Sequence, residues 1–178
     1  MWAIQTMGKF LRKIIPTLKT SPSKIHPKNY GRNINRIVIH CTGSTQEATV
    51  ESILKYFKVN LGWKSPGYHY MISPNGDITN TWPINKVSNG VRGYNYDSVH
   101  ISYIGGEIND NRTPLQKISL KKLINDLRED NNLGKLPVVG HRDLSPDLNG
   151  DGVISKYEWV KRCPSFDVKN WLKEENIL

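Results

Sequence analysis

The sequence of 178 residues has little cysteine, with only Cys41 and Cys163. Two cysteines exclude the disulfide-rich scaffolds of small secreted domains, and they leave open a single disulfide between these two residues. Long apolar runs are also missing, so no segment is suited to span a membrane. Near the N-terminus, Lys9, Arg12 and Lys13 interrupt the apolar run that a secretory signal needs. We therefore expect synthesis in the cytoplasm without a recognisable signal peptide.

Acidic residues are absent from residues 1–36, where eight basic residues lie. The other 17 basic residues are balanced by 16 acidic ones, so this segment carries most of the formal net charge of +9. We interpret residues 1–34 as a basic N-terminal arm and residues 35–178 as a single domain with enough apolar residues for a core. The arm is suited to bind an anionic surface, such as an envelope polymer; a solvated tail is the alternative.

Hydrophobic periodicity predicts an α/β fold. Strands are predicted at residues 36–42, 99–104 and 137–140, and a hairpin at residues 67–79 contains an Asn-Gly turn. Apolar residues recur at helical spacing in residues 45–61 and 114–127. Because strands alternate with helices and the hairpin adds an antiparallel pair, we expect a mixed central β-sheet flanked by helices.

Three potential metal ligands lie near the ends of these strands. His40 ends the first predicted strand, His141 follows the last, and Cys163 lies farther along. Open α/β sheets usually bind ligands at such an edge, and two imidazoles with one thiolate form a zinc set that leaves a fourth position for water. Spacing alone also fits two hydrogen-bonded histidines and a buried cysteine.

A second metal pattern lies between His141 and Cys163. Residues 147–158 fit the loop D-x-[DN]-x-[DN]-G-x5-E, which binds calcium through oxygen ligands. The ligands would be the side chains of Asp147, Asn149, Asp151 and Glu158 and the backbone carbonyl of Val153. No helix-forming run precedes this loop, so we expect a structural calcium site and not a sensor. A surface turn rich in Asn, Gly and Asp is the alternative.

Six short motifs occur in the order seen in zinc-dependent N-acetylmuramoyl-L-alanine amidases. They are IVIHCT at 37–42, GYHY at 67–70, GYN at 93–95, Ser98 followed by the glycines at 105–106, GHRD at 140–143 and KRCPSFD at 161–167. Over residues 35–172 the sequence resembles the type-2 branch of this family, which includes phage T7 lysozyme and the peptidoglycan recognition proteins. The resemblance implies the amidase fold of this branch.

The resemblance also implies roles for individual residues. His40, His141 and Cys163 match the zinc ligands of the family, and Tyr68 and Lys161 match its catalytic tyrosine and lysine. The implied reaction is zinc-dependent hydrolysis of the amide bond between N-acetylmuramic acid and L-alanine in peptidoglycan, during cell-wall lysis of the endolysin type. Peptidoglycan or muropeptides would be the partner of a monomer, with no specific nucleic acid. Without the resemblance, Tyr68 would be a packed strand residue and Lys161 a solvated lysine.

Departures from the family pattern concern the surroundings of these residues. The predicted strand at 99–104 lacks a carboxylate that some relatives use as general base, and residues 88–90 (SNG) stand where phage-type relatives can carry a histidine. His100 occupies a position where the family usually keeps a small residue. We expect Asn95 and His100 to contact substrate; a hydrogen-bonded structural histidine is the alternative for His100.

The 21 residues between His141 and Cys163 form an insertion relative to short phage-type relatives. Calcium bound at residues 147–158 would fix this insertion and aim Lys161 and Cys163 at the site. Other functions stay open. They are a recognition module that binds muropeptides without cutting them, a cytoplasmic amidase that recycles muropeptides, and a calcium-dependent structural protein.

Overall fold

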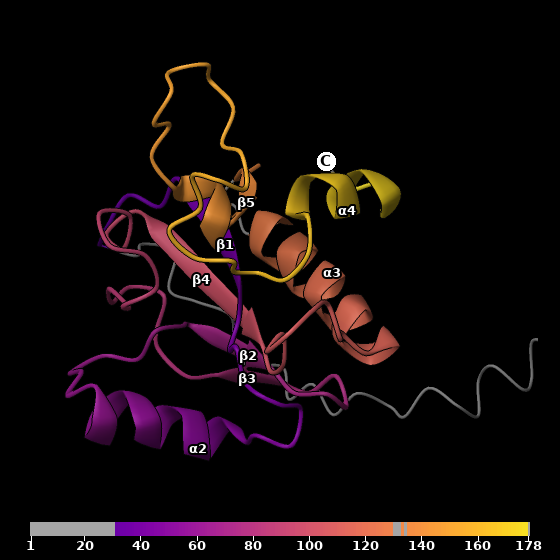
Figure 1. Ribbon diagram of the computed structural model, residues 1–178. Coiled ribbons are helices and arrows are strands. Elements are labelled where there is room, and N and C mark those ends of the chain that lie inside the picture. The colour runs from indigo at the N-terminus through magenta and orange to yellow at the C-terminus, as the bar shows by residue number, and fades with distance from the viewer. Residues whose placement is uncertain (1–30, 130–132, 134, 178) are drawn as a thin grey trace, which may run out of the picture.

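The computed structural model describes residues 31–129, 133 and 135–177 (Figure 1). Five strands form one sheet in the order β3-β2-β4-β1-β5. β1 pairs in parallel with β4 and β5, β2 pairs in parallel with β4, and β3 pairs antiparallel with β2. The strands are β1 (Arg36–Cys41), β2 (Tyr70–Ile72), β3 (Ile78–Asn80), β4 (Ser98–Tyr103) and β5 (Val138–Gly140). The predicted mixed sheet is therefore confirmed.

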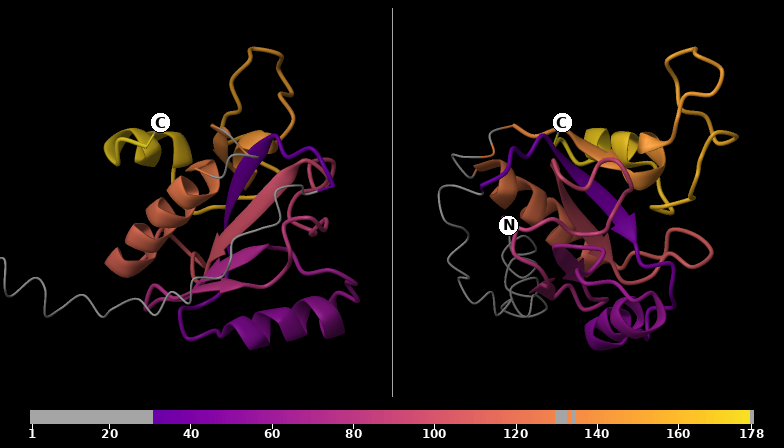
Figure 2. Two further views of the ribbon diagram at one scale, coloured as in Figure 1. Left: turned by 180° about the vertical axis from the view of Figure 1, so that it is seen from behind. Right: turned by 90° about the vertical axis from the view of Figure 1, so that its left-hand side faces the viewer.

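Helices lie on both sides of this sheet (Figures 1 and 2). Helix α2 (Val50–Lys55) continues into a π-helical turn, η1 (Tyr56–Asn60), while α3 (Pro114–Glu129) and α4 (Val168–Glu174) lie on the other side. α2 is shorter than the helix predicted at 45–61, because the Thr49 side chain accepts the Ser52 backbone N–H and starts the helix there. None of the described helices is long and apolar enough to cross a membrane.

Side chains alternate between the two faces of the sheet, as the strand period requires. Ile37 and Ile39 of β1 pack in the larger apolar cluster, which includes residues of α3 and α4. Met71 of β2 packs with α2 and η1 in a smaller cluster on the other face. His40 lies on this second face, where its ring is 5.0 Å from that of Tyr68, a side chain packed against the smaller cluster.

The domain begins before residue 35. The Arg32 guanidinium donates hydrogen bonds to the carbonyls of Ile84 (2.7 Å) and Ser98 (3.0 Å), and the Ile34 side chain is buried in the larger cluster. Both residues had been assigned to the basic arm, and their side chains pack on the domain. Arm residues 1–30 lie outside the described residues.

Candidate metal centre

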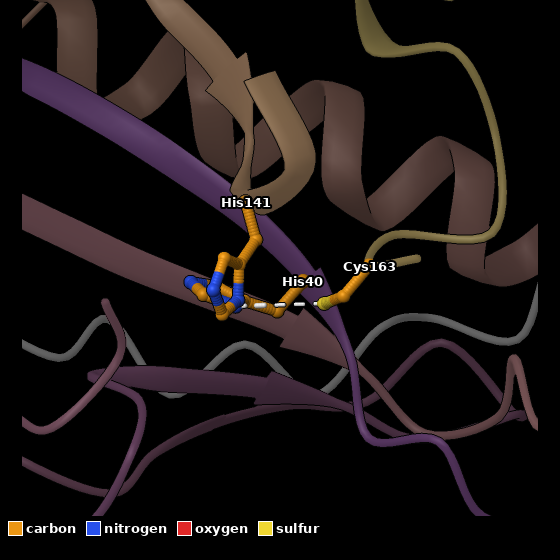
Figure 3. A group of neighbouring side chains, drawn as sticks. All are labelled: His40, His141 and Cys163. Atoms are coloured by element: carbon orange, nitrogen blue, oxygen red, sulfur yellow. Dashed lines mark hydrogen bonds between the residues drawn. The ribbon is translucent and has the colours of Figure 1, made fainter. Parts of the chain in front are cut away.

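The structure brings together the three side chains that were predicted as zinc ligands (Figure 3). His40 extends from β1, His141 begins the short 3-10 helix η2 (His141–Leu144) after β5, and Cys163 precedes α4. The Nδ1 atoms of the two histidines are 3.2 Å apart, and Cys163 Sγ is 3.6 Å from His40 Nδ1. Within the described part of the chain, no other group of three His, Cys, Asp or Glu side chains brings its ligand atoms within 4.8 Å of one another.

These separations fit a tetrahedral zinc ion. Zn–N bonds of about 2.0–2.1 Å and a Zn–S bond of about 2.3 Å place two nitrogens about 3.3 Å apart, and nitrogen and sulfur about 3.6 Å apart. The observed 3.2 Å and 3.6 Å agree with both values. The donor set is also one that zinc prefers.

Backbone contacts hold Cys163 against the strand ends. Its carbonyl accepts the Arg142 backbone N–H at 2.6 Å, and its Sγ accepts the Cys41 backbone N–H at 3.3 Å. A Cβ at Gly140 would lie 2.9 Å from Pro164 Cδ, so a glycine at the end of β5 permits this approach. Three segments that are distant in sequence are thus fixed to one another by short contacts.

Both histidines of the group are neutral near pH 7. Burial holds the pKa of His40 well below its usual value, and the nearby His100 and His141 lower it further. Burial lowers the pKa of His141 to about 4, and the positive charge of Lys161 acts in the same direction. Neutral imidazoles keep a nitrogen lone pair available, as metal coordination requires.

The two predicted catalytic side chains, Tyr68 and Lys161, both lie near this group. The Tyr68 hydroxyl donates to the Cys41 carbonyl at 3.4 Å, and burial raises the pKa of this hydroxyl far above its usual value. Tyr68 therefore stays protonated and can act as a hydrogen-bond donor. Lys161 is exposed and lines the pocket next to His141.

This pocket has a volume of about 770 Å³. It carries two cationic side chains, Arg92 and Lys161, and no aspartate or glutamate among its described lining residues, in keeping with the missing carboxylate of β4. Sequence reasoning missed Arg92 and Trp63; the position of Arg92 directly before the GYN motif was the available signal. The lining residues are Trp63, Asn89, Gly90, Val91, Arg92, Gly93, Tyr94, Asn95, His141, Leu144, Ser145, Pro146, Val160 and Lys161.

The two predicted substrate contacts differ. Asn95 lines the pocket, although its Oδ1 accepts the Val91 backbone N–H at 2.7 Å and so shapes the pocket loop as well. His100 is fully buried, with its ring between those of His40 and His69. Its side chain has no exposed surface in the structure.

The segment with the calcium-binding pattern projects from the sheet between β5 and α4 (Figure 1). Its carboxylates accept backbone N–H groups: Asp147 accepts those of Gly150 (2.7 Å) and Gly152 (2.8 Å), and Glu158 accepts that of Ser155 (2.7 Å). These carboxylates do not form a group whose ligand atoms lie within 4.8 Å of one another.

The base of this segment is attached beside the pocket. Ser145 Oγ accepts the Val160 backbone N–H at 3.1 Å, which joins the two ends of the loop. The Arg142 guanidinium lies over the Trp159 ring at 4.2 Å.

A mixed sheet with a two-histidine, one-cysteine group beside a pocket defines a candidate metal-dependent hydrolase. Residues 30–164 match the family described as N-acetylmuramoyl-L-alanine amidase. That match covers most of the chain. The protein therefore belongs to the N-acetylmuramoyl-L-alanine amidase family.

Individual relatives agree with this assignment. A protein of Haemophilus influenzae is 40% identical over 108 residues, which cover 58% of this chain and 91% of that protein. The endolysin of Klebsiella phage KP32 is 28% identical over 151 residues, covering 81% of this chain and 89% of the endolysin. Among solved structures, the N-acetylmuramoyl-L-alanine amidase LysC from Clostridium intestinale aligns with a TM-score of 0.63 and 26% identity, over 86% of this chain and 93% of LysC.

Proposed function

We propose that this protein hydrolyses the amide bond between N-acetylmuramic acid and L-alanine in peptidoglycan, with zinc held by His40, His141 and Cys163. The observation that carries the proposal is the agreement of the 3.2 Å and 3.6 Å separations with tetrahedral zinc, beside a pocket of about 770 Å³. The family assignment supplies the bond that is cut.

The roles of the surrounding residues follow from their positions. Zinc, when bound, supplies a Lewis acid that activates water and polarises an amide carbonyl. Lys161 places a positive charge at the pocket wall, where it stabilises the negative charge that develops on the carbonyl oxygen. Tyr68, protonated and next to His40, orients the reacting groups as a hydrogen-bond donor.

The charge of the pocket supports a peptide substrate with free carboxylates. Arg92 and Lys161 are its cations, and no acidic side chain opposes them among the described lining residues. The stem peptide of peptidoglycan carries such carboxylates, and a bidentate guanidinium is the side chain best suited to bind one. We assign Arg92 and Asn95 to the substrate-binding wall.

The proposal is tested by mass spectrometry of the products released from isolated peptidoglycan, with and without a zinc chelator. We expect stem peptides that begin at L-alanine, their loss with the chelator and their return with zinc. Cys163→Ser removes a ligand and should abolish both zinc retention and product, whereas the control Lys156→Met, exposed and outside the ligand group, should retain both. Intact peptidoglycan in every condition, with binding retained, would favour a non-catalytic recognition module.

The biological role in this proposal is cell-wall lysis of the endolysin type. Endolysins of several phages align over most of their own lengths, as the KP32 enzyme does at 89%. A muropeptide-recycling amidase would instead prefer soluble fragments. Comparing turnover of isolated cell walls with turnover of soluble muropeptides separates the two roles, and a strong preference for soluble fragments would contradict lysis.

Calcium binding by residues 147–158 is a further part of the proposal, and what supports it is the spacing of Asp147, Asn149, Asp151 and Glu158. We expect calcium to raise the melting temperature, since a ligand that binds only the native state stabilises it. Asp147→Asn combined with Asp151→Asn should remove the effect, and magnesium is the control cation. An unchanged melting temperature at millimolar calcium would leave a surface turn as the correct interpretation.

A further inference from the structure

His100 lies directly behind the zinc-ligand candidate His40. Its Nδ1 is 3.0 Å from His40 Nε2, and both rings are buried. The parallel register places His100 opposite Val38 and Ser102 opposite His40, so the imidazole reaches His40 diagonally across two neighbouring strands. This contact joins the middle of β4 to the end of β1.

The direction of the hydrogen bond follows from the position of the other ligands. His40 Nδ1 faces His141 and Cys163, so a metal-binding His40 keeps this nitrogen unprotonated and carries its proton on Nε2. The Nε2–H group therefore donates to His100 Nδ1. His100 must then carry its own proton on Nε2, a buried atom with no hydrogen-bond partner among the described residues.

A buried Nε2–H of His100 without a hydrogen-bond partner costs free energy, so another interaction of His100 must compensate for it. The His100 ring is held by its neighbours in the orientation that serves His40. The His100 backbone N–H donates to His69 Nδ1 at 3.0 Å, and the two rings stack at 5.8 Å with an interplanar angle of 8°. Among the described residues, the bond from His40 is the one interaction in which the His100 side chain acts as acceptor.

Gly90 provides the space for this ring. A Cβ at Gly90 would lie 2.3 Å from His100 Nδ1, a distance that requires the ring to move. The Gly90 backbone does not adopt the left-handed conformation that would itself favour glycine. A side chain at position 90 is therefore excluded by His100 and not by the backbone.

We propose that His100 is a positioning residue that accepts the Nε2–H of His40, fixes its tautomer and ring orientation for metal binding, and depends on Gly90 for its own position. The inference rests on the proposed function, because it presumes that His40 binds zinc. Groups that hydrogen-bond to a metal-binding histidine typically change metal affinity about 10–100-fold when they are removed.

The experiment compares zinc dissociation constants, measured by competition with a chromophoric chelator, and melting temperatures of the metal-free proteins. His100→Leu fills part of the space but cannot accept a hydrogen bond, and we expect zinc affinity to fall about 10–100-fold. His100→Asn places an amide oxygen near the position of Nδ1 and should restore most of the affinity. Ser98→Ala is the control and should bind zinc normally, because Ser98 lies on the same strand and its hydroxyl has no hydrogen-bond partner in the described part of the chain.

The outcomes separate the inference from the function on which it rests. No zinc binding by the unmodified protein overturns the proposed function. Tight binding by the unmodified protein and by a folded His100→Leu variant overturns the role of His100 alone. If the Leu variant does not fold, the His100→Asn variant decides. A His100→Asn protein with normal metal-free stability that binds zinc as weakly as a variant without one zinc ligand would contradict the role of His100 as acceptor.

Gly90→Ala tests the second half of the inference. In the presence of His100 it should weaken zinc binding, because the new methyl group displaces the ring from His40. Combined with His100→Ala it should have little further effect, since the small residue leaves room for the methyl group. Equal losses in both backgrounds would show that Gly90 acts independently of His100.

Discussion

In the proposed mechanism, Lys161 stabilises the negative charge that develops on the carbonyl oxygen of the amide. Lys161→Met should reduce kcat about 10²–10³-fold, the effect of removing one group that stabilises a developing oxyanion. Zinc retention should not weaken, because the substitution removes a positive charge beside His141 that repels a bound cation. Steady-state kinetics and metal analysis measure both quantities.

Lys156→Met is the matched control, since Lys156 is exposed in the same inserted segment and does not line the pocket. Its kcat should be unchanged. A Lys161→Met variant with normal kcat would remove this residue from the proposed mechanism.

At the scale of residues, the sequence could predict the three candidate zinc ligands but not the hydrogen bond from His40 to His100 behind them. His40 ends one apolar run that favours a buried strand and His141 follows another, and parallel strands bring their ends to one edge. The burial of His100 depends on the space left by Gly90 and on the neighbouring ring of His69. These residues come from different segments, and hydrophobic periodicity within one segment does not predict which segments meet.

At the scale of elements, Gln116 connects α3 to the sheet. Its Nε2 donates to the carbonyls of Ile72 (3.0 Å) and Ile104 (2.9 Å), and the side chain is fully buried. Gln116→Leu should lower the free energy of unfolding by about 2–4 kcal/mol, because the Ile104 carbonyl and the Thr113 N–H lose their partner and the Ile72 carbonyl keeps only the Ile104 N–H. Urea denaturation provides the measurement.

The neighbouring Lys117→Leu is the control, because Lys117 is exposed on the same helix and its substitution should stay within about 0.5 kcal/mol. Equal effects of the two variants would show that the bonds of Gln116 are not needed to hold α3.

The elements themselves were predicted with uneven success, for physical reasons. The strands and α3 were found because their apolar residues repeat over enough positions. α4 was missed, since seven residues offer about two helical turns; its local signals were the Asp167 N-cap and the helical spacing of Val168, Trp171 and Leu172. The π-helical turn η1 follows α2 without a break in apolar spacing, so the change in backbone winding could not be seen in the sequence.

At the scale of the whole molecule, the uneven charge distribution predicts salt-sensitive binding to anionic polymers. Replacing Lys9, Arg12, Lys13, Lys19, Lys24 and Lys28 with Gln should weaken binding to isolated anionic cell-wall polymer several-fold at low salt. The difference should vanish at about 1 M salt, where the Debye length is about 3 Å. Sedimentation of the protein with the polymer measures binding.

Hydrolysis of soluble muropeptides should be the same for both proteins, because these substitutions leave the pocket intact. Salt-independent binding, or equal binding by the two proteins at low salt, would identify the arm as a solvated tail.

The three candidate ligands span residues 40–163, and β1 must pair with β5 before His40 and His141 meet. Bringing such distant segments together is entropically costly and occurs late when a chain folds. A metal ion that needs all three side chains therefore finds no complete binding site in the transition state. Zinc should then slow the unfolding of this protein while leaving its folding rate nearly unchanged, so that the ion protects the native molecule without guiding its formation.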